Sequence, residues 1–235
     1  MPAGRVIGHR GAVRLAPENT LAAFRAAARV GARWVETDVS LLGDGTPVIC
    51  HDADLGRIAG RRERLADLAA EDLALLGVAE KVPTLAAALE ALDDFGLSVN
   101  LDVKARGDAE DLAAALVLEL TRRPWPRERL LVSSFDAEVL AVLAAARPDI
   151  RLGILCEEIP DDWALQAARV RAVALHPYRR ALSPAFAVEM LAAGLEIYAW
   201  TVNDPAEAMR LWGWGVTGVI TDDPALLLGL AGASA

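Results

Sequence analysis

Two of the three histidines in this 235-residue chain stand beside residues that suit phosphate chemistry. His9 is followed by Arg10 and Gly11, and His51 is followed by Asp52. Histidine exchanges protons near neutral pH, and arginine can hold two phosphate oxygens in a planar fork. Glycine lets a ligand approach the backbone closely. Either histidine alone would more often be a hydrogen-bonded core residue, but together these residues indicate proton transfer at a phosphate ester.

Three carboxylates and a lysine occupy alternate positions on two strand-like segments. Glu36 and Asp38 share one face of the first segment, and Asp102 and Lys104 share one face of the second, because side chains alternate along a strand. A buried salt bridge to Lys104 would neutralise one carboxylate and leave two uncompensated, which is costly. We therefore expect a bound divalent cation. Ligands that are all oxygens favour Mg²⁺ or Ca²⁺ over zinc.

The composition predicts a globular protein that acts on small molecules. Hydrophobic residues make up 54% of the chain, and the net charge is −9. Clustered Lys and Arg provide most of the affinity for nucleic acid, so this acidic chain is not expected to bind it. We also expect no stable membrane association, because no signal-type stretch or long uncharged apolar run is present. Cys50 and Cys156 lie in apolar runs and are expected to be buried thiols, which favours a cytoplasmic enzyme.

Strand-like segments alternate with Ala- and Leu-rich segments of helical periodicity, as in an α/β barrel. Eight such strands are predicted, over 5–9, 34–39, 98–104, 130–135, 151–156, 172–176, 196–201 and 218–221. Helices are predicted over 84–95, 111–122 and 137–146, among others. Eight strand–helix units are the number that closes a TIM (βα)8 barrel, and about 250 residues are typical of that fold. We therefore expect residues 1–235 to form a single domain.

A ninth apolar segment, 47–52, follows the second strand too closely to be parallel to it. A parallel crossover needs about a dozen residues or more, whereas Asp44-Gly45 is a typical hairpin turn. This segment is therefore predicted to return antiparallel, bringing His51 to the carboxyl ends of the strands, where barrel enzymes have their sites. Residues 53–82 are predicted to form a small charged insertion of unassigned role.

The chain resembles the glycerophosphodiester phosphodiesterase family, a branch of the barrels similar to phosphatidylinositol phospholipase C. The motifs that carry the resemblance follow in order along nearly the whole chain. They are His9-Arg10-Gly11, Pro17-Glu18-Asn19-Thr20, Glu36-Thr37-Asp38-Val39, Asp44-Gly45-Thr46-Pro47-Val48, His51-Asp52, Lys81-Val82-Pro83-Thr84-Leu85, Asn100-Leu101-Asp102-Val103-Lys104, Ser133-Ser134-Phe135, Trp200-Thr201-Val202-Asn203 and Ile220-Thr221-Asp222-Asp223-Pro224.

The resemblance implies metal-dependent hydrolysis of glycerophosphodiesters to glycerol 3-phosphate and an alcohol. The roles it implies are an acid–base pair, His9 and His51; metal ligands, Glu36, Asp38 and Asp102; and phosphate contacts, Arg10 and Lys104. The attacking group is either water or the glycerol 2-hydroxyl, which would give a cyclic phosphate. The chain departs from the family at Asp102, where glutamate is usual, which puts the choice of metal in question.

Other residues near these motifs have simpler interpretations. Trp200 is assigned to the wall of the substrate pocket, although it could instead be core. Asn19 and Thr20 are expected to cap the first helix, and Asp222 and Asp223 the last. Glu18 could support the site indirectly, Asp52 could orient His51 or cap its loop, and His176 could line the pocket or be structural. The alternative functions are a phosphodiesterase acting on lysophospholipids and a non-catalytic protein that binds phosphorylated ligands.

Overall fold

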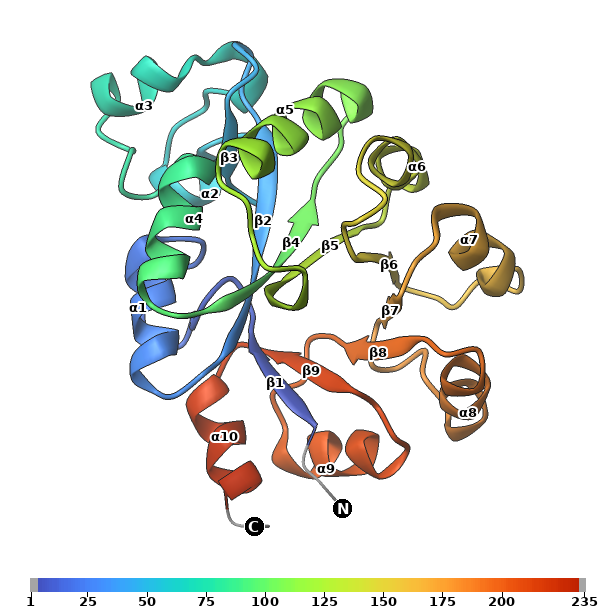
Figure 1. Ribbon diagram of the computed structural model, residues 1–235. Helices are drawn as coiled ribbons and strands as arrows, with labels where there is room; N and C mark the ends of the chain where they lie inside the picture. The colour runs from blue at the N-terminus through green and yellow to red at the C-terminus, as the bar shows by residue number, and fades with distance from the viewer. Residues whose placement is uncertain (1–3, 233–235) are drawn as a thin grey trace.

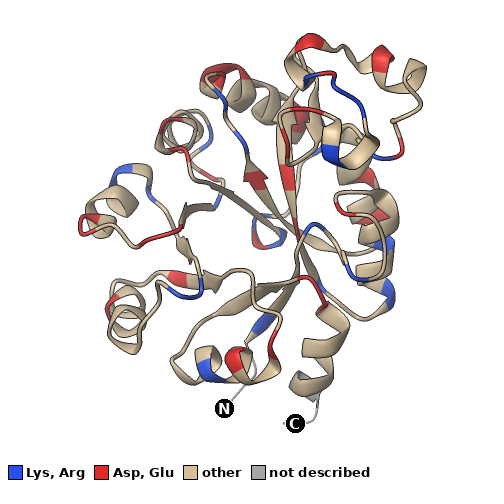
Figure 2. Cartoon of the chain, turned by 180° about the vertical axis from the view of Figure 1, so that it is seen from behind, with Lys and Arg blue, Asp and Glu red and all other residues tan. Residues whose placement is uncertain are grey.

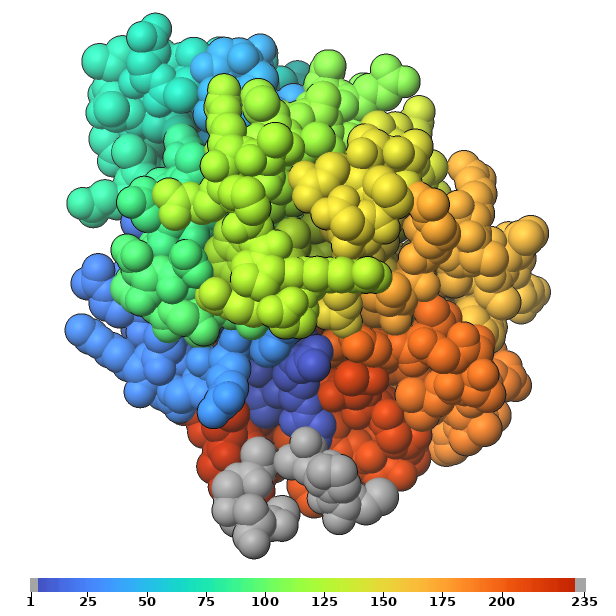
Figure 3. All heavy atoms as spheres, viewed as in Figure 1, coloured from blue at the N-terminus to red at the C-terminus, as the bar shows by residue number. Residues whose placement is uncertain are grey.

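A computed structural model describes residues 4–232 and shows eight parallel strands closed into a barrel (Figure 1). The barrel strands are β1 (Arg5–Gly8), β2 (Trp34–Leu41), β4 (Ser98–Val103), β5 (Leu130–Ser134), β6 (Leu152–Cys156), β7 (Ala174–Pro177), β8 (Glu196–Ala199) and β9 (Gly218–Thr221). The barrel closes because β1 pairs with β2 on one side and with β9 on the other. In Figure 3 the dark blue first residues accordingly lie beside the orange-red ones near the end of the chain.

Helices between the strands form the outer layer. They are α1 (Leu21–Arg29), α4 (Leu85–Asp94), α5 (Ala109–Arg122), α6 (Ala137–Ala146), α7 (Trp163–Val170), α8 (Pro184–Ala192), α9 (Pro205–Gly213) and α10 (Pro224–Gly232), with a 3₁₀ turn η2 (Arg127–Arg129) before β5. Ser183 and Asp204 cap α8 and α9, each followed by proline at the first helical position. Apolar faces of the helices and strands form a continuous core between the two layers.

The hairpin after β2 is present as expected. Strand β3 (Pro47–Ile49) pairs antiparallel with β2, with Val39 opposite Ile49. It is followed by the insertion, which contains α2 (Gly56–Ala59), η1 (Leu65–Asp67) and α3 (Ala70–Leu75). The insertion packs against the hairpin in a small apolar cluster, in which Leu55 and Leu65 join Val48 and Cys50.

The predicted barrel is confirmed, and the predicted strand ends differ from the observed ones by at most two residues. The two-residue differences are at the end of β2, the start of β7 and the end of β8. None of the helices among residues 4–232 combines the length and the apolar character needed to cross a lipid bilayer. Figure 2 shows red acidic segments on two neighbouring strands near the barrel centre, where a core would normally be apolar.

Candidate active site

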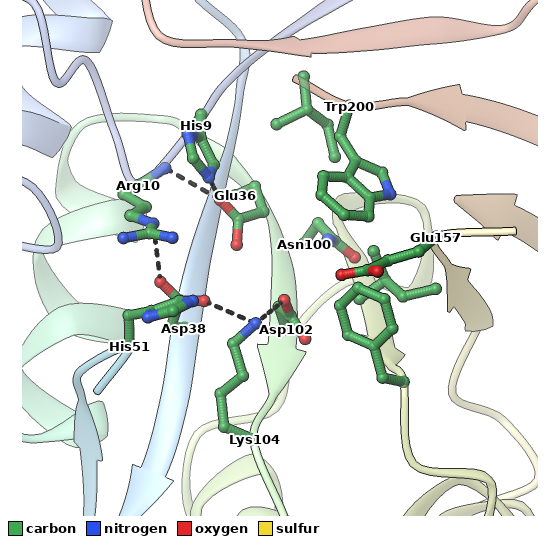
Figure 4. A pocket seen from close by; sticks show the side chains of 13 residues that line it. His9, Arg10, Glu36, Asp38, His51, Asn100, Asp102, Lys104, Glu157 and Trp200 are labelled. Carbon is green, nitrogen blue, oxygen red and sulfur yellow. Dashed lines mark hydrogen bonds and ion pairs between the residues drawn. The ribbon is translucent and has the colours of Figure 1, made fainter. Parts of the chain in front are cut away.

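Three acidic side chains meet inside the barrel at the carboxyl ends of β2 and β4. Asp38 lies directly opposite Asp102 in the strand pairing. Glu36 precedes Asp38 by two residues on β2, so both side chains lie on the same face of the strand. Glu36, Asp38 and Asp102 are 4%, 1% and 5% exposed, and each offers an oxygen within 4.8 Å of the other two. The three carboxylates therefore converge on a space of the size that one cation would fill (Figure 4).

Lys104 compensates this negative charge only in part. Its ammonium lies 3.1 Å from an Asp38 oxygen and also contacts Asp102 Oδ2, while Asp102 Oδ1 is buried without a hydrogen-bond partner. Burial and the charges of Asp38 and Glu36 raise the pKa of Asp102 to about 7. An orphaned buried oxygen in an all-carboxylate group suits a hard divalent cation, so the residues present fit a bound metal ion. A simple salt bridge does not explain all three acids.

His9 is fixed by a carboxylate from the opposite end of the sequence. Its Nδ1 donates to Asp222 Oδ1 at 2.6 Å, and its Nε2 faces the cavity 3.9 Å from Glu36. Asn203 holds Asp222 in turn, since its Nδ2 donates to Asp222 Oδ2 at 2.6 Å. Burial lowers the pKa of His9, but the Asp222 hydrogen bond and the Glu36 charge outweigh this effect and place the pKa above its usual 6.5.

Backbone of unusual conformation turns the chain sharply after His9. Arg10 has φ of 49° and Gly11 has φ of 92°, a region that glycine adopts without strain. A side chain at Gly8 would place Cβ 2.0 Å from the Gly11 carbonyl oxygen, so that position also requires glycine. The turn lets the Arg10 amide donate to Glu36 at 2.9 Å, and the Arg10 guanidinium bonds Glu18 at 2.7 Å. Arg10 therefore both shapes and lines the site.

Asn19 has a different role from the one its sequence predicts. Thr20 alone caps α1, accepting from the Ala23 amide at 3.1 Å. Asn19 is buried, adopts φ of 57°, and donates from its side chain to Asp38 at 2.7 Å. The cap prediction was therefore wrong for Asn19, because the left-handed turn points its amide into the barrel. Its contact orients Asp38 within the acidic group.

His51 follows β3 and lies at the same cavity as His9, as the hairpin predicts. Its Nδ1 donates to Asp52 at 2.7 Å, and Asp52 accepts from Arg57 of α2 at 2.7 Å. Arg57 also makes two 2.7 Å bonds to Glu18, the residue that holds Arg10. Asp52 therefore orients His51, and the insertion connects both histidine-bearing loops through Glu18.

A cavity of about 180 Å³ collects these residues. It is lined by His9, Arg10, Glu36, Asp38, His51, Asn100, Asp102, Lys104, Phe135, Leu155, Glu157, Trp200 and Ile220. Trp200 and Glu157 lie on one side of the cavity, across from His51 and Arg10 (Figure 4), and Phe135 and Leu155 add apolar surface to the lining. Trp200 is held there by a 2.7 Å bond from its indole nitrogen to the His176 carbonyl oxygen.

Sequence reasoning missed several residues that the cavity brings together. Asp222 was expected to cap α10, but Asp223 does so through the Leu226 amide, and Asp222 binds His9 instead. Glu157 follows β6 with no motif to mark it, and its lining position comes only from the barrel. His176 is fully buried with neither ring nitrogen hydrogen-bonded and is not among the lining residues, so its structural interpretation holds.

A TIM barrel with acidic, basic and imidazole side chains around one cavity at its carboxyl face has the arrangement of a barrel enzyme, with groups suited to a metal ion and to phosphate. The model of the glycerophosphoryl diester phosphodiesterase family matches residues 9–226, and the chain belongs to this family. A glycerophosphodiester phosphodiesterase of Caldanaerobacter subterraneus subsp. tengcongensis is 30% identical over 96% of both chains.

Solved structures agree with this assignment. An Oleispira antarctica phosphodiesterase, in complex with the product sn-glycerol-3-phosphate, has a TM-score of 0.89 and 33% identity. The similarity covers 96% of this chain and 95% of that one. The glycerophosphodiester phosphodiesterase of Thermotoga maritima has a TM-score of 0.79 and 29% identity, covering 96% and 97%. Both the sequence and the fold therefore support membership of the glycerophosphoryl diester phosphodiesterase family.

Proposed function

We propose that the protein hydrolyses glycerophosphodiesters to glycerol 3-phosphate and an alcohol with metal-dependent acid–base catalysis by two histidines. The observation that carries this proposal is the cavity that joins two carboxylate-paired histidines to a buried group of three acids. The sn-glycerol-3-phosphate bound by the Oleispira antarctica phosphodiesterase supports the same product here.

Glu36, Asp38 and Asp102 would hold the cation, with Mg²⁺ or Ca²⁺ the best match to an oxygen-only set. When bound, a divalent cation would offset the phosphate charge that repels an attacking oxygen. Arg10 and Lys104 border the same space and supply further positive charge for the phosphate oxygens.

The two histidines would divide the proton transfers. One takes the proton from the attacking hydroxyl, which is water or the glycerol 2-hydroxyl, and the other gives a proton to the leaving alcohol oxygen. Attack by the 2-hydroxyl would give a cyclic phosphate, which water would then open to glycerol 3-phosphate, with the histidines exchanging proton roles. Each presents Nε2 for this purpose, because each Nδ1 is occupied by an aspartate. Trp200 would pack against the carbon atoms of the substrate.

A metal screen tests the proposed reaction directly. EDTA-treated protein should be inactive on glycerophosphocholine and glycerophosphoethanolamine and should regain activity with Mg²⁺, Ca²⁺ or Mn²⁺ added singly. Release of glycerol 3-phosphate is the measurement, and lysophosphatidylcholine is the comparison substrate. Full activity in EDTA would contradict metal dependence, and phosphate binding without turnover under every metal would indicate a binding protein instead.

Removal of either imidazole tests the acid–base pair. His9→Ala and His51→Ala should each lower kcat by about 10²- to 10⁴-fold, the usual contribution of a positioned proton donor or acceptor. Circular dichroism and thermal unfolding should show a native fold in both variants. A near-wild-type rate in either variant would remove that histidine from the mechanism.

A further inference from the structure

One buried acceptor in the cavity is not used by the proposed chemistry. Asn100 on β4 is fully buried, and its Nδ2 donates to Ser133 Oγ at 2.9 Å. Its Oδ1 has no hydrogen-bond partner among residues 4–232. A buried carbonyl oxygen without a donor is destabilising, so natural proteins rarely keep one unless water or a ligand supplies the donor.

Glu157, an exposed residue that lines the same cavity, presents a second acceptor. Its carboxylate makes no hydrogen bond or ion pair with any residue in the described range 4–232. Lys104 and Arg10 do not compensate it, because Lys104 is bonded to Asp38 and Asp102 and Arg10 to Glu18 and Asp38. Figure 4 shows Glu157 and Asn100 pointing into the part of the cavity beside Trp200, away from His51 and Arg10.

The surroundings of these two acceptors define the chemistry that fits between them. Trp200 and Phe135 meet edge to face, with ring centroids 5.6 Å apart, and Leu155 lines the same side. Two acceptors would repel a phosphate oxygen but would accept hydroxyl hydrogens. An aromatic wall suits the carbon atoms that carry those hydroxyls. A short polyol joined to phosphate satisfies both requirements.

We propose that Asn100 and Glu157 form a subsite for the hydroxyls of the glycerol moiety, with Glu157 accepting from the terminal hydroxyl. This inference rests on the proposed function and specifies how its substrate is oriented. The phosphate then lies toward Arg10 and Lys104, and the leaving alcohol points away from Trp200. Both residues would determine specificity, because a site built to bond a hydroxyl discriminates strongly against an analogue that lacks it.

The test combines a variant with a substrate that lacks one hydroxyl. Glu157→Ala is assayed on glycerophosphocholine, on the analogue with the terminal glycerol hydroxyl replaced by hydrogen, and on glycerophosphoglycerol. Glu158→Ala is the matched control, because Glu158 is exposed and does not line the cavity. Asn100→Ala is tested in parallel, with its unfolding midpoint measured, since removal of a buried side chain could prevent folding.

Glu157→Ala should lower kcat/KM about 10- to 100-fold on both natural diesters, as expected for one lost bond to a charged group. Its rate on the deoxy analogue should change less than about threefold from wild type, and Glu158→Ala should match wild type on all three substrates. An equal loss on the analogue would overturn the subsite. A loss confined to the two choline substrates would also overturn it and assign Glu157 to the cationic head group.

These outcomes separate the subsite from the function on which it rests. Wild-type protein that turns over none of the three diesters with any metal refutes the proposed function, and the subsite with it. Wild-type turnover with an unaltered Glu157→Ala variant refutes the subsite alone.

Discussion

At the scale of single residues, the two histidines differ in what holds their aspartate partners. Asp222 beside His9 is held by the neutral amide of Asn203, whereas Asp52 beside His51 is held by the cationic Arg57. In both, the Nδ1 bond fixes the ring and directs Nε2 toward the cavity, the arrangement in which imidazole transfers protons efficiently. The aspartates are therefore positioning residues, and their loss should affect turnover more than binding.

Asp222→Asn should lower kcat about 10²-fold or more with little change in KM. An amide at this position can donate to Nδ1 rather than accept from it. This favours the tautomer with its proton on Nε2, which cannot accept a proton from the substrate. Asp223→Asn is the control, because Asp223 caps α10 through the Leu226 amide. Steady-state kinetics on glycerophosphocholine is the measurement, and equal kcat values for the two variants would exclude the positioning role.

The histidines could be predicted from sequence because each lies in a short motif at a strand end. Asp222 could not, because Asp223-Pro224 already explains a helix start and leaves the preceding aspartate without a visible function. Its contact with His9 requires that β9 pair with β1, and pairing across the barrel closure is a long-range contact. Asn19 was misassigned for a related reason, since its left-handed backbone is not visible in a pattern of polar residues.

At the scale of elements, the hairpin and the insertion after it place His51. The loop length and Asp44-Gly45 were enough to predict the antiparallel return of β3. The short helices of the insertion were not predictable, because segments of four to six residues carry too little periodicity. Arg57 links α2 to Glu18 and Asp52, while the apolar cluster around Leu55 and Leu65 packs the insertion against the hairpin.

Arg57→Ala should lower kcat about tenfold while changing the free energy of unfolding by less than about 1 kcal/mol. The Arg57 side chain is 48% exposed, and ion pairs in contact with solvent contribute little stability. It nevertheless orients Asp52, so His51 should become more mobile without it. Arg62→Ala is the matched control, an exposed arginine of the same insertion. Urea unfolding and kinetics together check the result, and unchanged kcat would show that the link is dispensable.

At the scale of the whole molecule, the barrel interior contains polar groups that the fold keeps from water. His176 is fully buried with both ring nitrogens unpaired and lies 5.1 Å from the ring of Tyr198. Burial, with a smaller effect from Arg151, lowers the pKa of His176 to about 3. Sequence predicted the eight strands that enclose this histidine, but its burial follows only from the packing inside the closed barrel.

Acid should therefore destabilise the fold partly through His176. Between pH 6.5 and pH 3 the unfolded chain binds a proton at this ring and the folded chain does not. The contribution of neutral His176 to the free energy of unfolding is therefore fully present above pH 6.5 and is lost as the pH falls toward 3. His176→Leu should remove this contribution. The difference in free energy of unfolding between wild type and variant should then change by up to about 1.4 kcal/mol per pH unit. Urea unfolding at pH 8, 6 and 5 measures the free energy of unfolding of both proteins. If the two values change in parallel with pH, His176 titrates normally.

The pairing of β1 with β9 also determines when activity can first arise during protein synthesis. Asp222, the carboxylate partner of His9, follows it by 213 residues in the chain. Synthesis therefore adds His51 and the acids of β2 and β4 to the chain well before the aspartate that orients the imidazole of His9. A chain truncated before β9 would lack both this aspartate and the strand that pairs with β1, so we expect it to have no efficient turnover.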